Sequence, residues 1–432
     1  SPPPEADRIF QAVQQRLSHQ KGAKTLVVVC ASGGGIQAAG WTTQVLTGLQ
    51  AALGTDFTKA IGLISGVSGG SVGSLHFLDR FDGSGAPPND PLILDDIFQA
   101  ATADSLGATG WGLVYPDLWR LLGLPFLTTE PRDRGAAIDL DWKTHMKHPN
   151  ATLRGWAQAI ENGKMPIPVF NATIVEDGRR YLLSPMTFGL APEQGVEFNG
   201  LYRDCDVDAS TAALLSATFP YVTPVTRNSR APQNEPIFHV ADGGYFDNFG
   251  IVTAVDFLEK LLEQDQSRTI EKVLLVEIRA FPDEPPLKTA PDHRVGWKMA
   301  LFGPIFTIVG ARNATQSQRN ADDVQDLIEQ YRGMVEITDY KIAFPKIKFF
   351  QMPVPETAKA MYEKFAAKKP DDNTAFESYW HEKAETQYQP PLSWTLTKKQ
   401  RQDIRRAWRE LLNTENSDAA KLIARWKASH PG

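Results

Sequence analysis

Short apolar runs rich in β-branched residues alternate with stretches of helical periodicity through the first part of the chain. The runs at Thr25–Cys30 and Ala60–Ile64 are uninterrupted and bounded by turn residues, as is typical of buried strands. Each leads into a glycine/serine turn and then into a stretch in which apolar residues recur at helical spacing, ending near Leu53 and Leu78. Strand, turn and helix, repeated within 80 residues, predict an α/β fold with a mostly parallel sheet.

The same patterns continue to about residue 354. Strands are predicted at Ile167–Thr173, Arg179–Leu183, Ile237–Ala241 and Lys272–Ile278, with a helix after the third of them. The runs at 335–340 and 347–352 predict a late hairpin. From about Pro355 the composition shifts to charged helices. We therefore expect an N-terminal helix or linker over 1–23, an α/β domain over 24–354, and a helical C-terminal extension over 355–432.

Three amphipathic or apolar stretches each leave two interpretations open. The segment near 105–127 is a buried cap or a wall for an apolar ligand, and Trp297–Val309 is a core helix or a mobile lid. Both are apolar cap segments of the α/β domain, and neither spans a bilayer as one helix, which takes roughly 20 residues. The helix over Lys398–Leu412 sets basic residues opposite apolar ones. It pairs with acidic groups of the protein or makes peripheral contact with an anionic membrane.

Composition narrows the class of protein. The chain has 432 residues, of which 42% are hydrophobic and 22% charged, as in globular proteins. Its net charge of −6 argues against a nucleic-acid partner, and two cysteines exclude a disulfide framework or a cysteine-based metal cluster. No signal peptide is visible. We expect a soluble or membrane-peripheral protein; because the chain starts at Ser1, an upstream leader or anchor stays open, as does the oligomeric state.

The sharpest chemical signal is Gly66-Val67-Ser68-Gly69-Gly70, a G-x-S-x-G sequence between a predicted strand and a predicted helix. A serine on such a tight turn presents its hydroxyl in the open, and small neighbours such as Gly66 and Gly70 let the backbone fold that sharply. The positive N-terminus of the following helix favours an alkoxide or oxyanion. Ser68 is therefore a candidate nucleophile, although the five-residue pattern alone also occurs in unreactive loops.

A second signal is Ser32-Gly33-Gly34-Gly35, directly after the first strand. Consecutive glycines expose backbone N–H groups that can hold an anion, so Gly33, Gly34 and Gly35 form a candidate oxyanion hole. The same residues with Ala38 also fit the G-x-G-x-x-A turn of dinucleotide-binding proteins. That alternative needs an acid at the end of the second strand, whereas Asp56 precedes it.

The third signal is Asp242-Gly243-Gly244 at the end of a predicted strand. Active residues of α/β sheets gather at strand ends, and a carboxylate there can accept the serine proton and return it to the leaving group. A turn aspartate that bonds its own backbone is the structural alternative.

Taken together, these signals resemble the patatin-like phospholipase family, which includes the cytosolic phospholipase A2 enzymes. The shared order is a glycine-rich loop at Gly33–Gly35, then G-x-S-x-G around Ser68, then D-G-G at Asp242. The stretch 215–220 also resembles the small-residue segment that precedes the family's aspartate. The resemblance covers roughly residues 24–280.

The resemblance implies a three-layer α/β/α fold and hydrolysis of lipid acyl esters by a Ser68–Asp242 dyad, without a metal or other cofactor. The substrate would be a phospholipid, a lysophospholipid or a neutral ester. Many patatins carry Asp before the glycines and Arg two residues after them, where this chain has Ser32 and Gln37. The missing guanidinium makes neutral esters and lysolipids more credible than charged phospholipids.

Two other hypotheses stay open. A Ser-His-Asp triad would follow the order Ser68, Asp242, His293. His239 lies three residues before Asp242 on the same strand and should face the opposite side of the sheet. The other hypothesis is a lipid-binding module without catalytic activity. The presence of both Ser68 and Asp242 argues against it.

Overall fold

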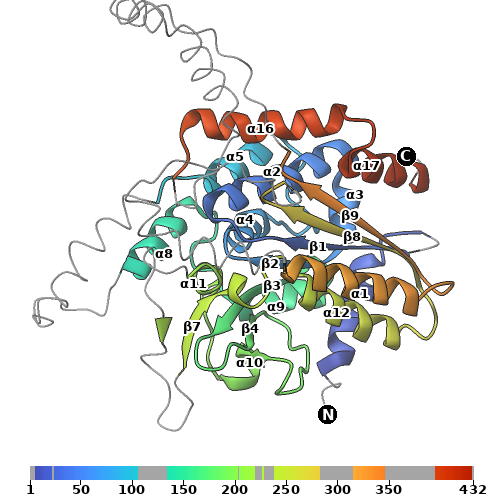
Figure 1. The fold of residues 1–432 in the computed structure, drawn as a ribbon, viewed down its shortest axis with the longest axis horizontal. Coiled ribbons are helices and arrows are strands. Elements are labelled where there is room, and N and C mark those ends of the chain that lie inside the picture. Colours follow the sequence, from blue (N-terminus) through green and yellow to red (C-terminus); the bar gives the residue numbers. More distant parts are fainter. Residues whose placement is uncertain are drawn as a thin grey trace, which may run out of the picture.

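A computed structural model describes residues 5–21, 24–105, 134–202, 204–218, 226–227, 238–282, 315–345 and 395–430. A nine-stranded sheet forms its centre (Figure 1). Five neighbouring strands run parallel in the order β3 (Ile167–Ile174), β2 (Ile61–Val67), β1 (Lys24–Ala31), β8 (Ile270–Arg279) and β9 (Glu336–Ala343). Both faces of β1 and β2 are covered, which explains why their sequences are continuously apolar.

Short strands extend the sheet beyond β3. β4 (Arg180–Leu183) runs antiparallel to β3, and β5 (Val196–Glu197) runs parallel to β4. β7 (His239–Asp242) also pairs antiparallel with β3, and β6 (Thr226–Arg227) pairs antiparallel with β7. Three strands therefore pair with β3. β4 pairs with one edge, and β2 and β7 pair with successive parts of the other edge, so that they meet end to end.

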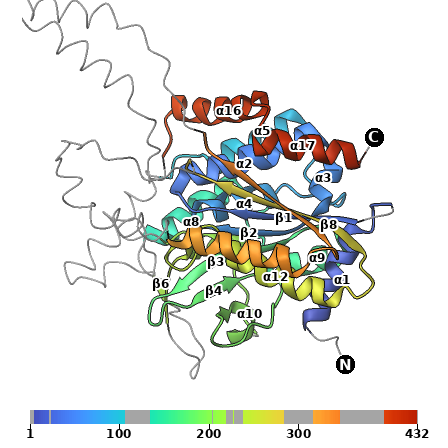
Figure 2. The ribbon, with the colours of Figure 1, turned by 45° about the vertical axis from the view of Figure 1, so that its right-hand side comes forward.

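Helices cover both faces of the sheet (Figure 2). One layer contains the helices that follow β1 and β2, together with the C-terminal helices: α2 (Gly35–Leu53), α3 (Thr55–Ala60), α4 (Gly69–Leu78), α5 (Pro91–Ala101), α16 (Lys398–Asn413) and α17 (Asp418–Ser429). The other contains α1 (Glu5–Leu17), α9 (Leu153–Glu161) and α12 (Ile251–Gln264). The remaining named helices are α8 (Arg134–His145), α10 (Phe198–Leu201), α11 (Ala209–Ser216) and the 3-10 turn η3 (Gly243–Tyr245). The predicted α/β class with a mostly parallel sheet and C-terminal helices is confirmed.

The C-terminal helices pack into the body of the fold. Trp408 of α16 lies against α2 at Gly48, where a Cβ atom would come within 2.3 Å of the indole nitrogen. Arg405 of α16 pairs with Asp95 of α5, and Arg406 pairs with Asp403 and Glu410 of its own helix. Two of the basic residues of α16 thus form ion pairs with acidic residues of the same chain. α16 begins with a capping box formed by Thr397.

The run at 335–340 forms most of β9, which runs parallel to β8 over Lys272–Arg279. The predicted late hairpin is not tested. Its second arm at 347–352 lies outside the described residues, as do most of the cap segment near 105–127 and all of Trp297–Val309. No helix in the described part of the chain is both long and apolar enough to cross a membrane.

Candidate active site

Ser68 lies on the turn between β2 and α4 in a backbone conformation that side-chain-bearing residues avoid. Its φ is 52° and its ψ is −122°, and Arg268 is the only other described non-glycine residue with positive φ. Such strain persists only where the surrounding structure enforces it, and it gathers at functional sites. The residue is 6% exposed, so its hydroxyl is held in a confined environment rather than on an open loop.

Neighbouring glycines make this turn sterically possible. A Cβ atom at Gly66 would lie 2.9 Å from the Cα atom of Ser71, and one at Gly70 would lie 2.2 Å from the carbonyl oxygen of Ala31. At Gly69 the corresponding distance to the carbonyl oxygen of Gly35 is 1.9 Å. The turn after β2 and the glycine loop after β1 are therefore packed backbone to backbone, as the small residues in both sequences allow.

Ser216, at the C-terminal end of α11, fixes the main chain of Ser68. Its hydroxyl accepts a hydrogen bond from the backbone N–H of Ser68 at 3.1 Å and lies 2.7 Å from the hydroxyl of Ser71. The same hydroxyl donates to the carbonyl oxygen of Asn171 in β3. All of these groups are buried, so the network ties the strained turn to the sheet.

Strand register brings Asp242 to Ser68. Val67, the last residue of β2, pairs with Asn171 of β3, and the next residue of β3, Ala172, pairs with Asp242. β7 thus ends where β2 ends, and Asp242 lies beside the turn that carries Ser68. A Cβ atom at Gly243 would lie 3.2 Å from Cγ1 of Val67, which shows how closely the two strand ends meet.

The two oxygens of the Asp242 carboxylate differ in their hydrogen bonding. Oδ1 accepts a hydrogen bond of 2.8 Å from the backbone N–H of Gly244, whereas Oδ2 is buried and makes no hydrogen bond of regular geometry with any described residue. Burial raises the pKa of Asp242 to about 6, although the Ser68 hydroxyl and the Gly244 N–H both lower it by stabilising the charged form. A pKa close to neutral suits a general base.

One of the three backbone N–H groups predicted to form the oxyanion hole is already hydrogen-bonded within the protein. The backbone N–H of Gly33 donates to the carbonyl oxygen of Asn248 at 2.9 Å, so it is not available to an oxyanion. Gly34 and Gly35 have φ values of 146° and 59°, and their N–H groups make no hydrogen bond within the described chain. Both stand at the N-terminus of α2, where the helix dipole favours negative charge.

Ser32 holds the glycine loop against the end of β8. Its hydroxyl accepts a hydrogen bond from the backbone N–H of Ala280 at 2.9 Å, and its own N–H donates to Ile278. These bonds tie the glycine loop to the end of β8. Gln37 is fully buried within α2.

No described histidine hydrogen-bonds to Ser68 or Asp242. His239 is half-exposed and lies 2.6 Å from the carboxylate of Glu176, as expected for a residue on the other face of β7. His76 is buried in α4, and neither of its ring nitrogens has a hydrogen-bond partner among the residues that the structure describes. His293 lies outside the described residues, so the triad hypothesis is left to experiment.

The dinucleotide hypothesis lacks its main requirements. Asp56 is exposed in α3 and pairs with Lys59 instead of ending a strand. The glycine loop is in contact with Gly69 and with the main chain of Asn248, so the turn at Ser68 occupies the space beside it. Within the described ranges, no three His, Cys, Asp or Glu side chains are grouped closely enough to hold a metal ion.

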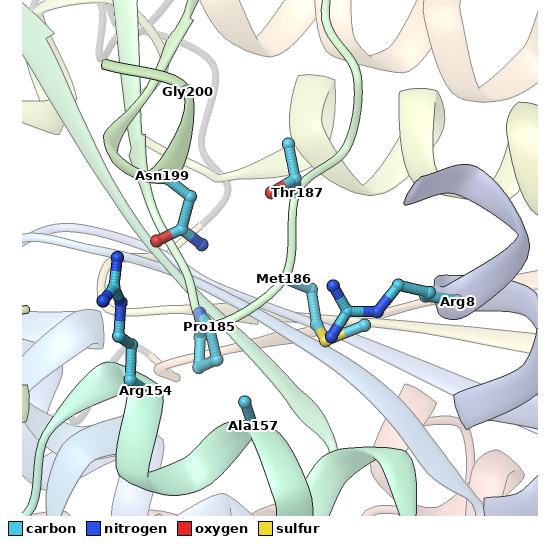
Figure 3. Close-up of a pocket in the computed structure, with 8 residues that line it drawn as sticks. All are labelled: Arg8, Arg154, Ala157, Pro185, Met186, Thr187, Asn199 and Gly200. Atoms are coloured by element: carbon cyan, nitrogen blue, oxygen red, sulfur yellow. The ribbon is translucent and has the colours of Figure 1, made fainter. Parts of the chain in front are cut away.

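A separate cavity of about 400 Å³ lies away from Ser68 (Figure 3). Arg8 of α1 and Arg154 of α9 reach toward it, and Asn199 and the loop after β4 complete its lining. Because β4 runs antiparallel to β3, this loop lies at the opposite end of the sheet from Ser68. None of the candidate catalytic residues lines this cavity.

No protein-family model matches the sequence, and no curated protein matches it either. Among solved structures, human GIVD cytosolic phospholipase A2 is similar with a TM-score of 0.37 and 13% identity, over 63% of this chain and 48% of that one. The same protein in complex with methyl gamma-linolenyl fluorophosphonate gives 0.44 and 13%, over 98% and 62%. VipD from Legionella pneumophila gives 0.32 and 13%, over 91% and 75%. The chain thus spans less than two thirds of the human structures, and its chemistry has to be inferred from its own site.

Two residues of the site were not predicted from the sequence. Ser216 fell within the stretch 215–220 that contributed to the family resemblance, but its bond to the nucleophile's N–H had no local signal. Asn248 follows the D-G-G sequence by a few residues, and its carbonyl oxygen takes the N–H of Gly33. Both act on residues that are distant in sequence, so spacing alone could not identify them.

Proposed function

We propose that the protein is a serine hydrolase that cleaves carboxylic esters of lipids through an acyl-enzyme on Ser68. The observation that carries this proposal is the buried Asp242 carboxylate, whose Oδ2 atom is open, beside a serine held at a φ of 52°. A strained serine between a strand and a helix, next to a carboxylate with a pKa of about 6, is suited to nucleophilic catalysis.

In the proposed reaction, Oγ of Ser68 attacks the ester carbonyl carbon while its proton passes to Oδ2 of Asp242. The carbonyl π electrons move to the oxygen, and the N–H groups of Gly34 and Gly35 hold the resulting oxyanion at the N-terminus of α2. Collapse of the tetrahedral intermediate breaks the bond to the alcohol oxygen, which takes the proton from Asp242. Water then repeats the sequence on the acyl-enzyme, which releases the fatty acid and restores Ser68.

The assignment of lipid esters rests on the order of the motifs around Gly33–Gly35, Ser68 and Asp242, which resembles that of patatin-like phospholipases. The site requires no cofactor for this chemistry because nucleophile, base and oxyanion donors are all supplied by the chain. The departure at Gln37 favours neutral esters and lysolipids over diacyl phospholipids.

A substrate panel tests the proposal. Neutral esters, lysolipids and diacyl phospholipids are assayed with the wild type and with Ser68→Ala, whose fold is checked by circular dichroism. We expect turnover in at least one ester class and loss of at least ~10³-fold in Ser68→Ala. Full activity of that variant would refute the assignment of the nucleophile. Absence of turnover on every ester, short p-nitrophenyl esters included, would instead support a binding module.

A second pair of variants separates the dyad from the triad. If Asp242 is the only base, Asp242→Asn loses most of the activity and His293→Ala retains it. Equal losses in the two variants would favour a Ser-His-Asp triad.

A further inference from the structure

Gln316 lies against the loop that follows Asp242, although it belongs to a helix that comes much later in the chain. It is one of the helical residues 315–330 and is 6% exposed. Its Oε1 atom accepts a hydrogen bond of 2.9 Å from the backbone N–H of Asn248. Its Nε2 atom donates to the carbonyl oxygens of Gly244 at 3.2 Å and Phe246 at 3.0 Å. One buried side-chain amide thus binds the main chain of this loop at three points.

The first of these points, Gly244, also binds the proposed base. Its backbone N–H donates a hydrogen bond of 2.8 Å to Oδ1 of Asp242, while its carbonyl oxygen accepts from Gln316. The two groups flank the same Cα atom, so a shift of one moves the other. The Gly244 N–H and the Ser68 hydroxyl are the two hydrogen-bond donors that stabilise the charged form of Asp242. Gln316 therefore acts through Gly244 on the carboxylate that takes the Ser68 proton in the proposed reaction.

The last of these points, Asn248, binds the glycine loop. Its carbonyl oxygen accepts the backbone N–H of Gly33 at 2.9 Å, while its own N–H donates to Gln316. A Cβ atom at Gly33 would lie 3.2 Å from Cβ of Ser68, so this part of the loop is packed against the nucleophile. The hydrogen bond from Asn248 to Gln316 thus helps to fix the loop that carries the proposed oxyanion donors.

We infer that Gln316 is a positioning residue, which holds Gly244 against Asp242 and Asn248 against the glycine loop, so that the base and the oxyanion donors face Ser68 together. This inference rests on the proposed function. A glutamine is suited to this role because one planar amide supplies both an acceptor and two donors, and all three are used here.

The test compares the full-length wild type with Gln316→Met, which keeps a side chain of similar length but removes the amide. In this variant the main chain at Gly244 and Asn248 can shift, and a misplacement of about 1 Å costs roughly 100-fold in rate. The kcat for a short-chain p-nitrophenyl ester should therefore fall by roughly 10–100-fold. KM should change less, because Gln316 orients reacting groups and does not bind the substrate.

The pH dependence separates positioning from packing alone. When the Gly244 N–H moves away from Oδ1, the charged carboxylate loses a stabilising hydrogen bond and the pKa of Asp242 rises. The midpoint of the acidic limb in a plot of kcat/KM against pH should therefore move upward in Gln316→Met, by up to about one unit. A glutamine that only packs its helix against the loop would lower stability and leave this midpoint in place.

Gln50→Met is the matched control. Gln50 of α2 is also buried, and its amide also bonds at both ends, to the carbonyl oxygen of Pro87 and the hydroxyl of Thr58. Neither partner belongs to the proposed site. Gln50→Met should lower the free energy of unfolding in urea while kcat and the pH midpoint stay at their wild-type values.

The outcomes distinguish this inference from the proposed function. If Gln316→Met shows no cooperative urea transition, Gln316→Ala, in which water can reach the freed carbonyl oxygens, is measured in its place. Wild-type kcat or an unmoved midpoint in the folded Gln316 variant, with Ser68→Ala inactive, overturns the inference and leaves the proposed function standing. An equal effect in Gln50→Met also overturns it. If Ser68→Ala is active, the proposed function itself fails.

Discussion

Replacing Ser216 with alanine should disable the Ser68 turn without touching the reacting atoms. The Ser216 hydroxyl is the hydrogen-bond acceptor for the Ser68 N–H, at 3.1 Å, and Ser68 is 6% exposed. In Ser216→Ala this N–H is left buried without a partner, which costs about 1–3 kcal/mol. The Ser71 hydroxyl and the Asn171 carbonyl oxygen each lose a partner as well.

The loss should appear in both stability and rate. The free energy of unfolding, measured by urea denaturation, should fall by about 1–3 kcal/mol. If the turn relaxes from its strained φ, kcat falls by roughly 10–100-fold, since about 1.4 kcal/mol of lost positioning corresponds to tenfold. A p-nitrophenyl ester reports the rate directly.

Ser74→Ala is the matched control. Ser74 is also buried and lies in α4, about one helical turn after Ser71, where its hydroxyl donates a hydrogen bond to the carbonyl oxygen of Gly70. Its removal leaves no buried N–H unpaired, so kcat should stay near the wild-type value. If Ser216→Ala matches Ser74→Ala in both stability and kcat, Ser216 does not hold the nucleophile and the reasoning is wrong.

Three further predictions concern charge and packing. Burial raises the pKa of Asp242 from 3.8 to about 6, so ionisation of this carboxyl lowers the stability of the folded protein as pH rises through this range. At pH 8, Asp242→Asn should therefore be more stable than the wild type in urea denaturation, by up to about 3 kcal/mol. This difference should disappear below pH 4. Gly69→Ala places a Cβ atom 1.9 Å from the Gly35 carbonyl oxygen and should abolish both activity and a sharp thermal transition, whereas Gly83→Ala, with open space around it, should change neither. Burial lowers the pKa of His76 to about 3, so the folded protein loses stability as pH falls from 6.5 toward 3. His76→Leu should reduce this loss in acid-denaturation curves. An unchanged curve would contradict the prediction for His76.

The sequence predicted the parts of the fold whose signals are local. β1 and β2 are apolar runs followed by glycine turns, and the turn around Ser68 needs small residues within five positions. The pairing of β9 with β8 was not predicted, because more than fifty residues of chain separate the two strands and parallel pairing leaves no turn signal in the sequence.

The site was predicted in its residue types but not in its hydrogen bonding. Ser68, Asp242 and the glycine loop stand out because each needs a specific residue at a strand end. Which glycine N–H stays free depends on the carbonyl of Asn248, and what holds the Ser68 N–H depends on the hydroxyl of Ser216. Both contacts arise from tertiary packing, which residue spacing does not encode.

Trapping the acyl-enzyme tests the central claim most directly. The wild type is mixed with a slowly deacylating p-nitrophenyl ester, quenched in acid and digested, and the peptides are analysed by mass spectrometry. The account predicts one acyl group per chain on Ser68, a burst of p-nitrophenol of matching size, and neither in Ser68→Ala. An acyl group on another residue, or a full burst in Ser68→Ala, would contradict it.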